Sequence, residues 1–212
     1  PEEGADLAGF SADTGQLLWR TPAIDANLRN PGIAQIEAFA VWQHIVYVAR
    51  YDWKFSAYSV ESGQLLWEVK APSRTALDVA VDEHGVYLGA DDFVRAYDLE
   101  QANILWEKEF DSRVGPILVE DGVIYIALHS REISLVAIDL QTLTELWQTW
   151  LGDVDVTEIR SLILNTGVMY VGANRLIAVS KENGAVLWMG EPTGRLEELL
   201  FDNGLIYVRN TA

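Results

Sequence analysis

The stretch "ESGQLLW" at residues 61–67 nearly repeats "DTGQLLW" at residues 13–19. The tryptophan that ends each copy recurs along the chain at spacings of 48, 39, 41 and 41 residues. A period of roughly 40 residues is the signature of a repeat architecture, in which each repeat forms one supersecondary unit. The five tryptophans are Trp19, Trp67, Trp106, Trp147 and Trp188.

A tyrosine keeps the same period in a different part of each repeat. It follows a turn-like sequence such as "HGV", "DGVI" or "TGVM". Because two independent markers recur with the same period, the repeat does not arise by chance. The tyrosines are Tyr47, Tyr87, Tyr125, Tyr170 and Tyr207.

One repeat can be read in full over residues 117–150, "ILVEDGVIYIALHSREISLVAIDLQTLTELWQTW". "ILV" and "VIYIAL" are two short strands joined by a turn in which Gly122 supplies a positive φ angle. "SLVAIDL" and "ELWQTW" are the third and fourth strands. Four short antiparallel strands, with no helical spacing of apolar residues, predict a propeller blade.

The two ends of the chain each supply half of a repeat. Residues 199–212 contain only a first and second strand, and residues 7–20 contain only a third and fourth. The sequence therefore predicts one all-β domain over residues 1–212, a β-propeller of five four-stranded antiparallel blades with one blade composed of both termini. The alternative is a piece of a larger ring of seven or eight blades. The four continuous blades are expected at about 37–70, 77–109, 115–150 and 160–190.

The third strand, turn and fourth strand of each repeat resemble the tryptophan-docking motif of the PQQ-type, or quinoprotein-like, β-propellers. The resemblance covers nearly the whole chain, with departures where Ser11, Ser59 and Ser180 replace aspartate and Ala102 and Leu143 replace glycine. It implies that each tryptophan lies against the neighbouring blade and serves packing. The copies are "GFSADTGQLLW" (9–19), "AYSVESGQLLW" (57–67), "AYDLEQANILW" (96–106), "AIDLQTLTELW" (137–147) and "AVSKENGAVLW" (178–188).

The resemblance does not imply that the quinone chemistry is present. PQQ-dependent dehydrogenases hold their quinone on an eight-bladed ring with calcium, a catalytic aspartate and commonly adjacent cysteines. This chain has no cysteine, too few repeats and no clustered set of acids and amides for calcium. We therefore expect no PQQ, no calcium or other metal and no catalytic residue. The other branch of the family contains BamB-like scaffolds of outer-membrane protein assembly and propeller sensor domains.

Charge and composition restrict the partners. The chain has 32 acidic and 15 basic residues, a net charge of −17, so we expect no nucleic-acid partner and no attraction to anionic lipid. The longest apolar runs are strand-sized, which argues against direct membrane insertion. The first residue, Pro1, is compatible with removal of a signal peptide or with a trimmed chain. We expect an extracytoplasmic protein, periplasmic or secreted, with the cytoplasm left open.

Arginine recurs in the connections between successive repeats, which share one face of a propeller. The loop "RYDWKFS" (50–56) falls on the same face, and arginines and aromatics are common anchors of protein interfaces. These residues predict docking of a protein partner, against the alternative of a self-paired, solvated surface. The candidate contacts are Arg29, Arg74, Arg113, Arg160, Arg195, Tyr51, Trp53, Lys54 and Phe55.

A hydrolase is the competing hypothesis. Some five-bladed propellers cleave glycosides with carboxylates around the central channel, and such a reaction needs two carboxyl groups at a defined separation. Glu37, Asp78, Glu158 and Glu197 precede or begin first strands and are the candidates. The three histidines occupy unrelated positions in the repeat. The sequence thus favours a non-catalytic binding or scaffold module, with a channel hydrolase or a fragment of a larger quinoprotein-like propeller as alternatives.

Overall fold

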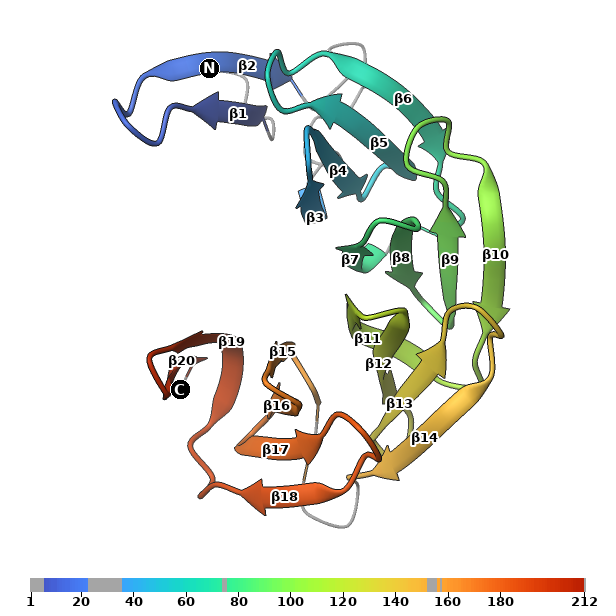
Figure 1. Ribbon diagram of the computed structural model, residues 1–212, viewed down its shortest axis with the longest axis vertical. Helices are drawn as coiled ribbons and strands as arrows, with labels where there is room; N and C mark the ends of the chain where they lie inside the picture. Colours follow the sequence, from blue (N-terminus) through green and yellow to red (C-terminus); the bar gives the residue numbers. More distant parts are fainter. Residues whose placement is uncertain (1–5, 23–35, 74–75, 152–155, 157, 212) are drawn as a thin grey trace. The chain divides into compact units, whose positions relative to one another are not determined.

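The computed structural model describes residues 6–22, 36–73, 76–151, 156 and 158–211 (Figure 1). Within these ranges every regular element is a β-strand. The chain divides into two compact units, residues 1–109 (unit 1) and residues 110–212 (unit 2), and each is described by itself.

Unit 1 contains two four-stranded antiparallel sheets and one two-stranded sheet, each with its strands in chain order. The two-stranded sheet comes first in the sequence and is formed by the first "GQLLW" motif. The strands are β1 (Asp6–Phe10) and β2 (Leu17–Pro22); β3 (Ile36–Trp42), β4 (Ile45–Arg50), β5 (Lys54–Ser59) and β6 (Leu65–Lys70); and β7 (Ala76–Val81), β8 (Val86–Ala90), β9 (Phe93–Tyr97) and β10 (Ile104–Glu109).

Unit 2 repeats this plan with the two-stranded sheet at its end. Its strands are β11 (Arg113–Glu120), β12 (Val123–His129), β13 (Ser134–Asp139) and β14 (Glu145–Trp150); β15 (Ser161–Asn165), β16 (Val168–Gly172), β17 (Leu176–Ser180) and β18 (Val186–Met189); and β19 (Arg195–Asp202) and β20 (Leu205–Thr211). The prediction of an all-β protein built from four-stranded antiparallel sheets is confirmed.

Neighbouring sheets of a unit pack face to face around apolar side chains. One core joins the sheets β3–β6 and β7–β10, and another joins β11–β14 and β15–β18. The first strands of adjacent sheets lie next to each other, β3 beside β7 in unit 1 and β15 beside both β11 and β19 in unit 2. Residues at the starts of first strands are thereby brought together, and this arrangement positions the candidate site.

The repeated tyrosine and tryptophan lie in one row across each complete sheet. In β3–β6, Tyr47 pairs with Ala57, which pairs with Trp67. Alanine carries only a methyl group, so the rings on either side can meet above it, with centroids 5.9 Å apart. Such aromatic pairs add about 0.5–1.5 kcal/mol beyond their burial. The other rows are Tyr87–Ala96–Trp106, Tyr125–Ala137–Trp147 and Tyr170–Ala178–Trp188.

Tryptophans also join one sheet to the next. The indole N–H of Trp19 donates to the carbonyl of Val60 at 2.7 Å. Trp67 donates to Leu99 at 3.2 Å, and Trp147 donates to Lys181 at 3.0 Å. These bonds link consecutive sheets inside each unit through the turn that precedes the next fourth strand. Trp106 and Trp188 contact the tyrosines of their own sheets, and their docking onto a neighbouring sheet stays a prediction.

Candidate functional site

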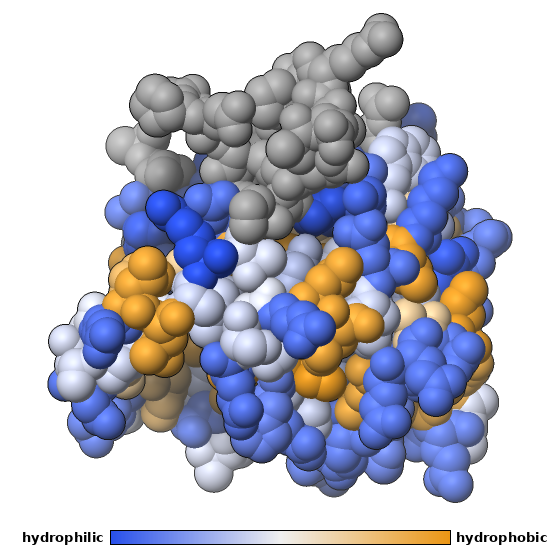
Figure 2. Space-filling view, turned by 90° about the horizontal axis from the view of Figure 1, so that it is seen from above, coloured by the Kyte–Doolittle hydropathy of each residue, from blue (hydrophilic) through white to orange (hydrophobic). Residues whose placement is uncertain are grey.

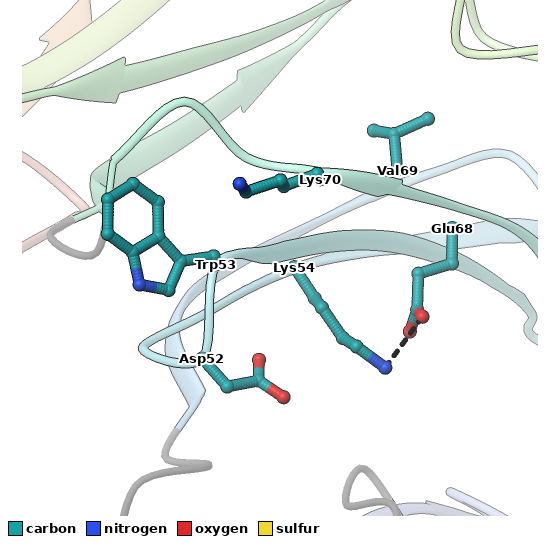
Figure 3. Close-up of a pocket in the computed structure, with 6 residues that line it drawn as sticks. All are labelled: Asp52, Trp53, Lys54, Glu68, Val69 and Lys70. Carbon is teal, nitrogen blue, oxygen red and sulfur yellow. Dashed lines mark ion pairs between the residues drawn. The ribbon is translucent and has the colours of Figure 1, made fainter.

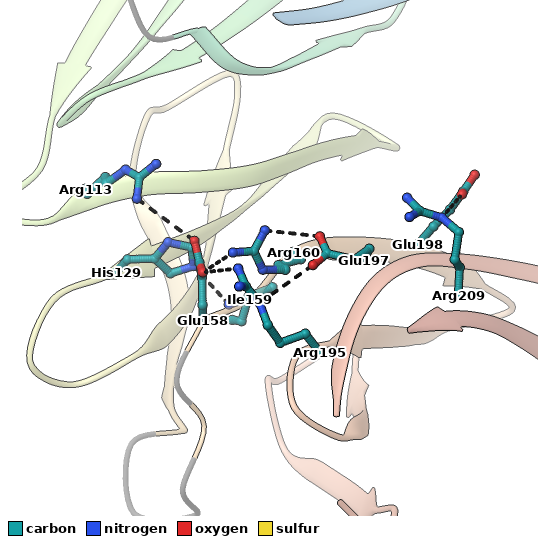
Figure 4. Close-up of polar contacts among 9 residues, drawn as sticks. All are labelled: Arg113, His129, Glu158, Ile159, Arg160, Arg195, Glu197, Glu198 and Arg209. Atoms are coloured by element: carbon teal, nitrogen blue, oxygen red, sulfur yellow. Dashed lines mark hydrogen bonds and ion pairs between the residues drawn. The ribbon is translucent and has the colours of Figure 1, made fainter. Parts of the chain in front are cut away.

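Five charged residues of unit 2 form an ion-pair network that we call the arginine cluster: Arg113, Glu158, Arg160, Arg195 and Glu197 (Figure 4). Arg113 and Arg195 are the first residues of β11 and β19, and Arg160 directly precedes β15. Because these first strands are neighbours, three arginines that are far apart in the sequence come together. Sequence reasoning named all three arginines but did not predict that they share two glutamates.

The arginines of the cluster differ in how tightly they are paired. Arg160 is held between two carboxylates, 2.5 Å from Glu158 and 3.1 Å from Glu197. Arg113 lies 4.0 Å from Glu158, and Arg195 lies 3.5 Å from Glu158 and 3.6 Å from Glu197. Charge-assisted N–H···O bonds are typically about 2.7–2.9 Å long. Arg160 is therefore a structural clamp, whereas Arg113 and Arg195 are only loosely engaged.

His129 supports the cluster from β12 and was missed by sequence reasoning. Its Nε2 accepts a hydrogen bond from the backbone N–H of Ile159 at 3.1 Å, which fixes the residue between Glu158 and Arg160. Gly115 leaves the space for this ring, since a Cβ there would lie 2.5 Å from it. Burial lowers the pKa of His129; Glu158 opposes this effect, and Arg113 and Arg160 add to it. The imidazole is thus neutral at pH 7 and available as an acceptor.

The aromatic loop of unit 1 forms a separate feature between β4 and β5. Arg50 and Asp52 are buried and make a bidentate ion pair, with bonds of 3.0 and 2.8 Å. This pair precedes Trp53, whose φ of +68° is unusual for a bulky residue. Trp53 and Lys54 line a pocket of about 420 Å³ together with Asp52, Glu68, Val69 and Lys70 (Figure 3).

Two of the four charged side chains that line this pocket are paired with each other. Lys54 lies 2.8 Å from Glu68, and the ammonium group of Lys70 lies 5.5 Å from the centre of the Trp53 ring. Tyr51 is partly exposed at 38%. Trp53 and Lys54 are half-buried, and the role of Tyr51, Trp53 and Lys54 as partner contacts stays a prediction.

Phe55 requires a correction, because its side chain is fully buried. Alternation along β5 turns Lys54 outward and Phe55 inward. The ring packs against Trp67 and Tyr97, with centroid distances of 5.5 and 5.3 Å. Phe55 therefore belongs to the core and not to a contact surface. Two other candidates, Arg29 and Arg74, lie outside the described residues.

The four carboxylates considered for a hydrolase are divided between the units. Glu158 and Glu197 are ion-paired to arginines in the cluster. In unit 1, Asp78 accepts a hydrogen bond from the N–H of Val79, and burial raises the pKa of Glu37. In the part of the chain that is described, no three His, Asp or Glu side chains are grouped to hold a metal ion. The same part has no helix of the length and apolarity needed to cross a membrane.

Solved structures with a similar fold include a BamB from Moraxella catarrhalis, with a TM-score of 0.60 and 16% identity over 98% of this chain and 74% of that one. A quinohemoprotein alcohol dehydrogenase from Pseudomonas putida also matches, with a TM-score of 0.63 and 14% identity over 83% of this chain and 38% of that one. At such low identity these likenesses show the fold alone, which is that of a propeller built from repeated four-stranded blades.

Comparison of the sequence identifies the family as well as the fold. The chain is 23% identical over 207 residues to the outer membrane protein assembly factor BamB of Yersinia pestis, covering 88% of this chain and 49% of the relative. It thus spans about half the length of that relative. The profile of the family described as "Outer membrane protein assembly factor BamB" matches residues 3–153 and 131–212. Together with the five in-register tryptophan motifs, this match shows that the chain belongs to the BamB family of PQQ-like repeat proteins.

Proposed function

We propose that this chain is a non-catalytic binding or scaffold module that docks a protein partner outside the cytoplasm, in the cell envelope. The observation that carries the proposal is the arginine cluster, which presents Arg113 and Arg195 with their side chains 52% and 56% exposed. Arginine is a frequent anchor of protein interfaces because its planar fork binds carboxylates with defined geometry. The relative from Yersinia pestis is named as an assembly factor for outer membrane proteins, which supports a role in a protein complex.

We also propose that the two-stranded sheets complete a blade, so that five blades close into a ring. Exposed apolar residues support this idea: Leu200, Leu205 and Tyr207 are 61%, 58% and 53% exposed, whereas the tyrosines of most complete sheets are buried. On β1 and β2, Gly9 pairs with Trp19 in the row that elsewhere contains tyrosine, alanine and tryptophan. Pairing Tyr207 opposite Gly9 would produce a fifth row. Figure 2 shows apolar patches among the polar residues of the surface in view.

A second candidate, a fragment of a larger propeller, is favoured by the length of the chain compared with that of its relative from Yersinia pestis. Because the chain covers 49% of its relative from Yersinia pestis, it also fits one part of a larger propeller. In that case other repeats would cover the exposed residues of β19 and β20. Binding of a protein partner through the arginine cluster is compatible with both arrangements, and no cofactor is needed for it.

The proposed function is tested by affinity capture from envelope extracts, followed by a titration with the purified partner. We expect the double variant Arg113→Glu and Arg195→Glu to weaken binding more than tenfold, about 1.4 kcal/mol or more. Because the new carboxylates would lie near Glu158 and Glu197, circular dichroism checks that the strands are kept. The control is Glu120→Gln with Asp121→Asn on the β11–β12 turn. These two carboxylates pair with Lys181, so neutralising them disturbs the fold less than reversing their charge. Loss of affinity in the control alone would place the interface on the acidic turns.

A further inference from the structure

Arg113 and Arg195 lie near different oxygens of the same carboxylate, that of Glu158. One nitrogen of Arg113 lies 4.0 Å from Oε1 of Glu158, and one nitrogen of Arg195 lies 3.5 Å from Oε2. A guanidinium group has five N–H donors, and a separation of 4.0 Å is too long for a hydrogen bond. Arg195 makes one long hydrogen bond to Glu158, at 3.5 Å, and lies 3.6 Å from Glu197. With five donors each, both arginines retain N–H groups that these contacts do not use (Figure 4).

The anion between them is held rigidly. Arg160 binds Glu158 and Glu197 at once, at 2.5 and 3.1 Å. The backbone hydrogen bond from Ile159 to His129 holds the chain between Glu158 and Arg160. The Glu158 carboxylate is consequently held in place, while the side chains of Arg113 and Arg195 keep longer contacts with it and stay more than half exposed.

The local charge differs from that of the protein as a whole. Three arginines face two glutamates in the cluster, an excess of one positive charge, in a chain whose net charge is −17. The surplus can neutralise one carboxylate. A polyanion such as nucleic acid would meet the repulsion of the remaining acidic surface.

We propose that Arg113 and Arg195 form a receptor for a single carboxylate, an aspartate or glutamate side chain in a loop of a protein partner. The carboxylate binds beside Glu158, to the exposed N–H donors of the two guanidinium groups that Glu158 does not use, through charge-assisted hydrogen bonds, while Glu158 and Arg160 stay in place. This inference rests on the proposed scaffold function and names the group that the scaffold recognises.

The direct test uses a short blocked peptide in place of the partner. Acetyl-Gly-Glu-Gly-amide is titrated into the whole chain while the guanidinium Nε–H signals are followed by NMR. We expect saturable shifts of the Arg113 and Arg195 signals, each assigned with its Arg→Lys variant. Acetyl-Gly-Gln-Gly-amide and sodium sulfate at equal ionic strength serve as the comparison ligands and should cause much weaker shifts.

Three variants sharpen the titration. Arg113→Gln with Arg195→Gln should weaken binding of the glutamate peptide at least tenfold. Arg209→Gln is the matched control, because Arg209 lies in the same unit, is 61% exposed and has its own partner, Glu198, at 3.0 Å. Glu158→Gln should strengthen binding several-fold, since it removes the competing negative charge and keeps an acceptor for Arg160.

Equal binding of the glutamine peptide, or of sulfate, would overturn the carboxylate receptor, as would unchanged affinity in the double variant. Comparing the peptide titration with partner capture distinguishes failure of the carboxylate receptor from failure of the scaffold function. If a captured partner binds the double glutamine variant as tightly as the wild type, the scaffold function is supported and the carboxylate receptor is wrong. Peptide binding at the two arginines with no partner captured supports the receptor and counts against the scaffold.

Discussion

The two copies "DTGQLLW" and "ESGQLLW" have nearly the same sequence and the same turn, but different surroundings. Gly15 and Gly63 have φ angles of +68° and +67°. A Cβ added at Gly63 would lie 2.4 Å from the ring of Trp19, whereas nothing lies within 4 Å of one added at Gly15. The local sequence therefore determines the turn, and a neighbouring sheet determines whether the turn tolerates a side chain.

The same contrast separates complete from incomplete sheets. Tyr47, Tyr87 and Tyr125 are 0–2% exposed, and each packs against the tryptophan ring of the fourth strand of its sheet. Tyr207, on a two-stranded sheet, is 53% exposed. A repeated residue is thus a core residue only where the rest of its repeat is present.

The largest expected effect comes from removing residues 199–212. If β20 pairs with β1 in a composite blade, the deletion leaves an open edge strand and exposes apolar side chains, so the shortened chain should aggregate. Size-exclusion chromatography and thermal melting measure the outcome. A truncated chain that stays monomeric with an unchanged melting temperature would show that the composite blade is wrong.

A large effect is also expected for Trp147→Ala in a complete row. The substitution removes the contact with Tyr125 and the bond to Lys181, and it should lower the free energy of unfolding by about 3–5 kcal/mol. Trp53→Ala in the aromatic loop is the control and should cost well under about 1 kcal/mol. Chemical denaturation compares the two, and equal losses would assign Trp53 to the core.

The glycine pair gives an intermediate effect that addresses the comparison directly. Gly15→Ala should cost about 1–2 kcal/mol, the strain of a left-handed backbone. Gly63→Ala adds the collision with Trp19 and should cost about 1–3 kcal/mol more. Both are measured by urea unfolding. Equal costs would mean that another sheet docks on the Gly15 turn in solution.

The smallest expected effect concerns pH. The pKa of His129 is lowered by burial, so on acidification the unfolded chain takes up a proton first, below its ordinary pKa of about 6.5. Stability should fall as the pH drops from that value toward the lower pKa of the folded state. His129→Gln should show a smaller loss between about pH 7 and about pH 5.

Melting temperatures across this range compare the variant with the wild type. His44→Gln is the control because the His44 side chain is 80% exposed, and its profile should follow the wild type. An unchanged acid sensitivity in His129→Gln would show that protonation of His129 does not contribute to the loss of stability at low pH.

Much of the fold could be predicted from the sequence because its determinants are local and repeated. The alternation of apolar residues marks the strands, the glycines mark turns, and a tyrosine is followed by a tryptophan 18 to 22 residues later in each complete repeat. The small alanine side chain between them is also explained by local pairing, since Ala57 lies opposite both Tyr47 and Trp67. The sequence did not show that Trp53 is half-buried or that Phe55 is fully buried, because the burial of Phe55 depends on β5 turning its ring toward Trp67 and Tyr97.

The candidate site was predictable only in part. Arg113, Arg160 and Arg195 could be recognised as inter-repeat arginines, but their sharing of Glu158 and Glu197 appears only when β11, β15 and β19 lie side by side. His129 carried no signal, because its partner is a backbone N–H 30 residues away. Pairing within a repeat is determined by nearby residues, whereas contact between charges on different repeats depends on how the sheets pack, and only the tertiary structure decides that.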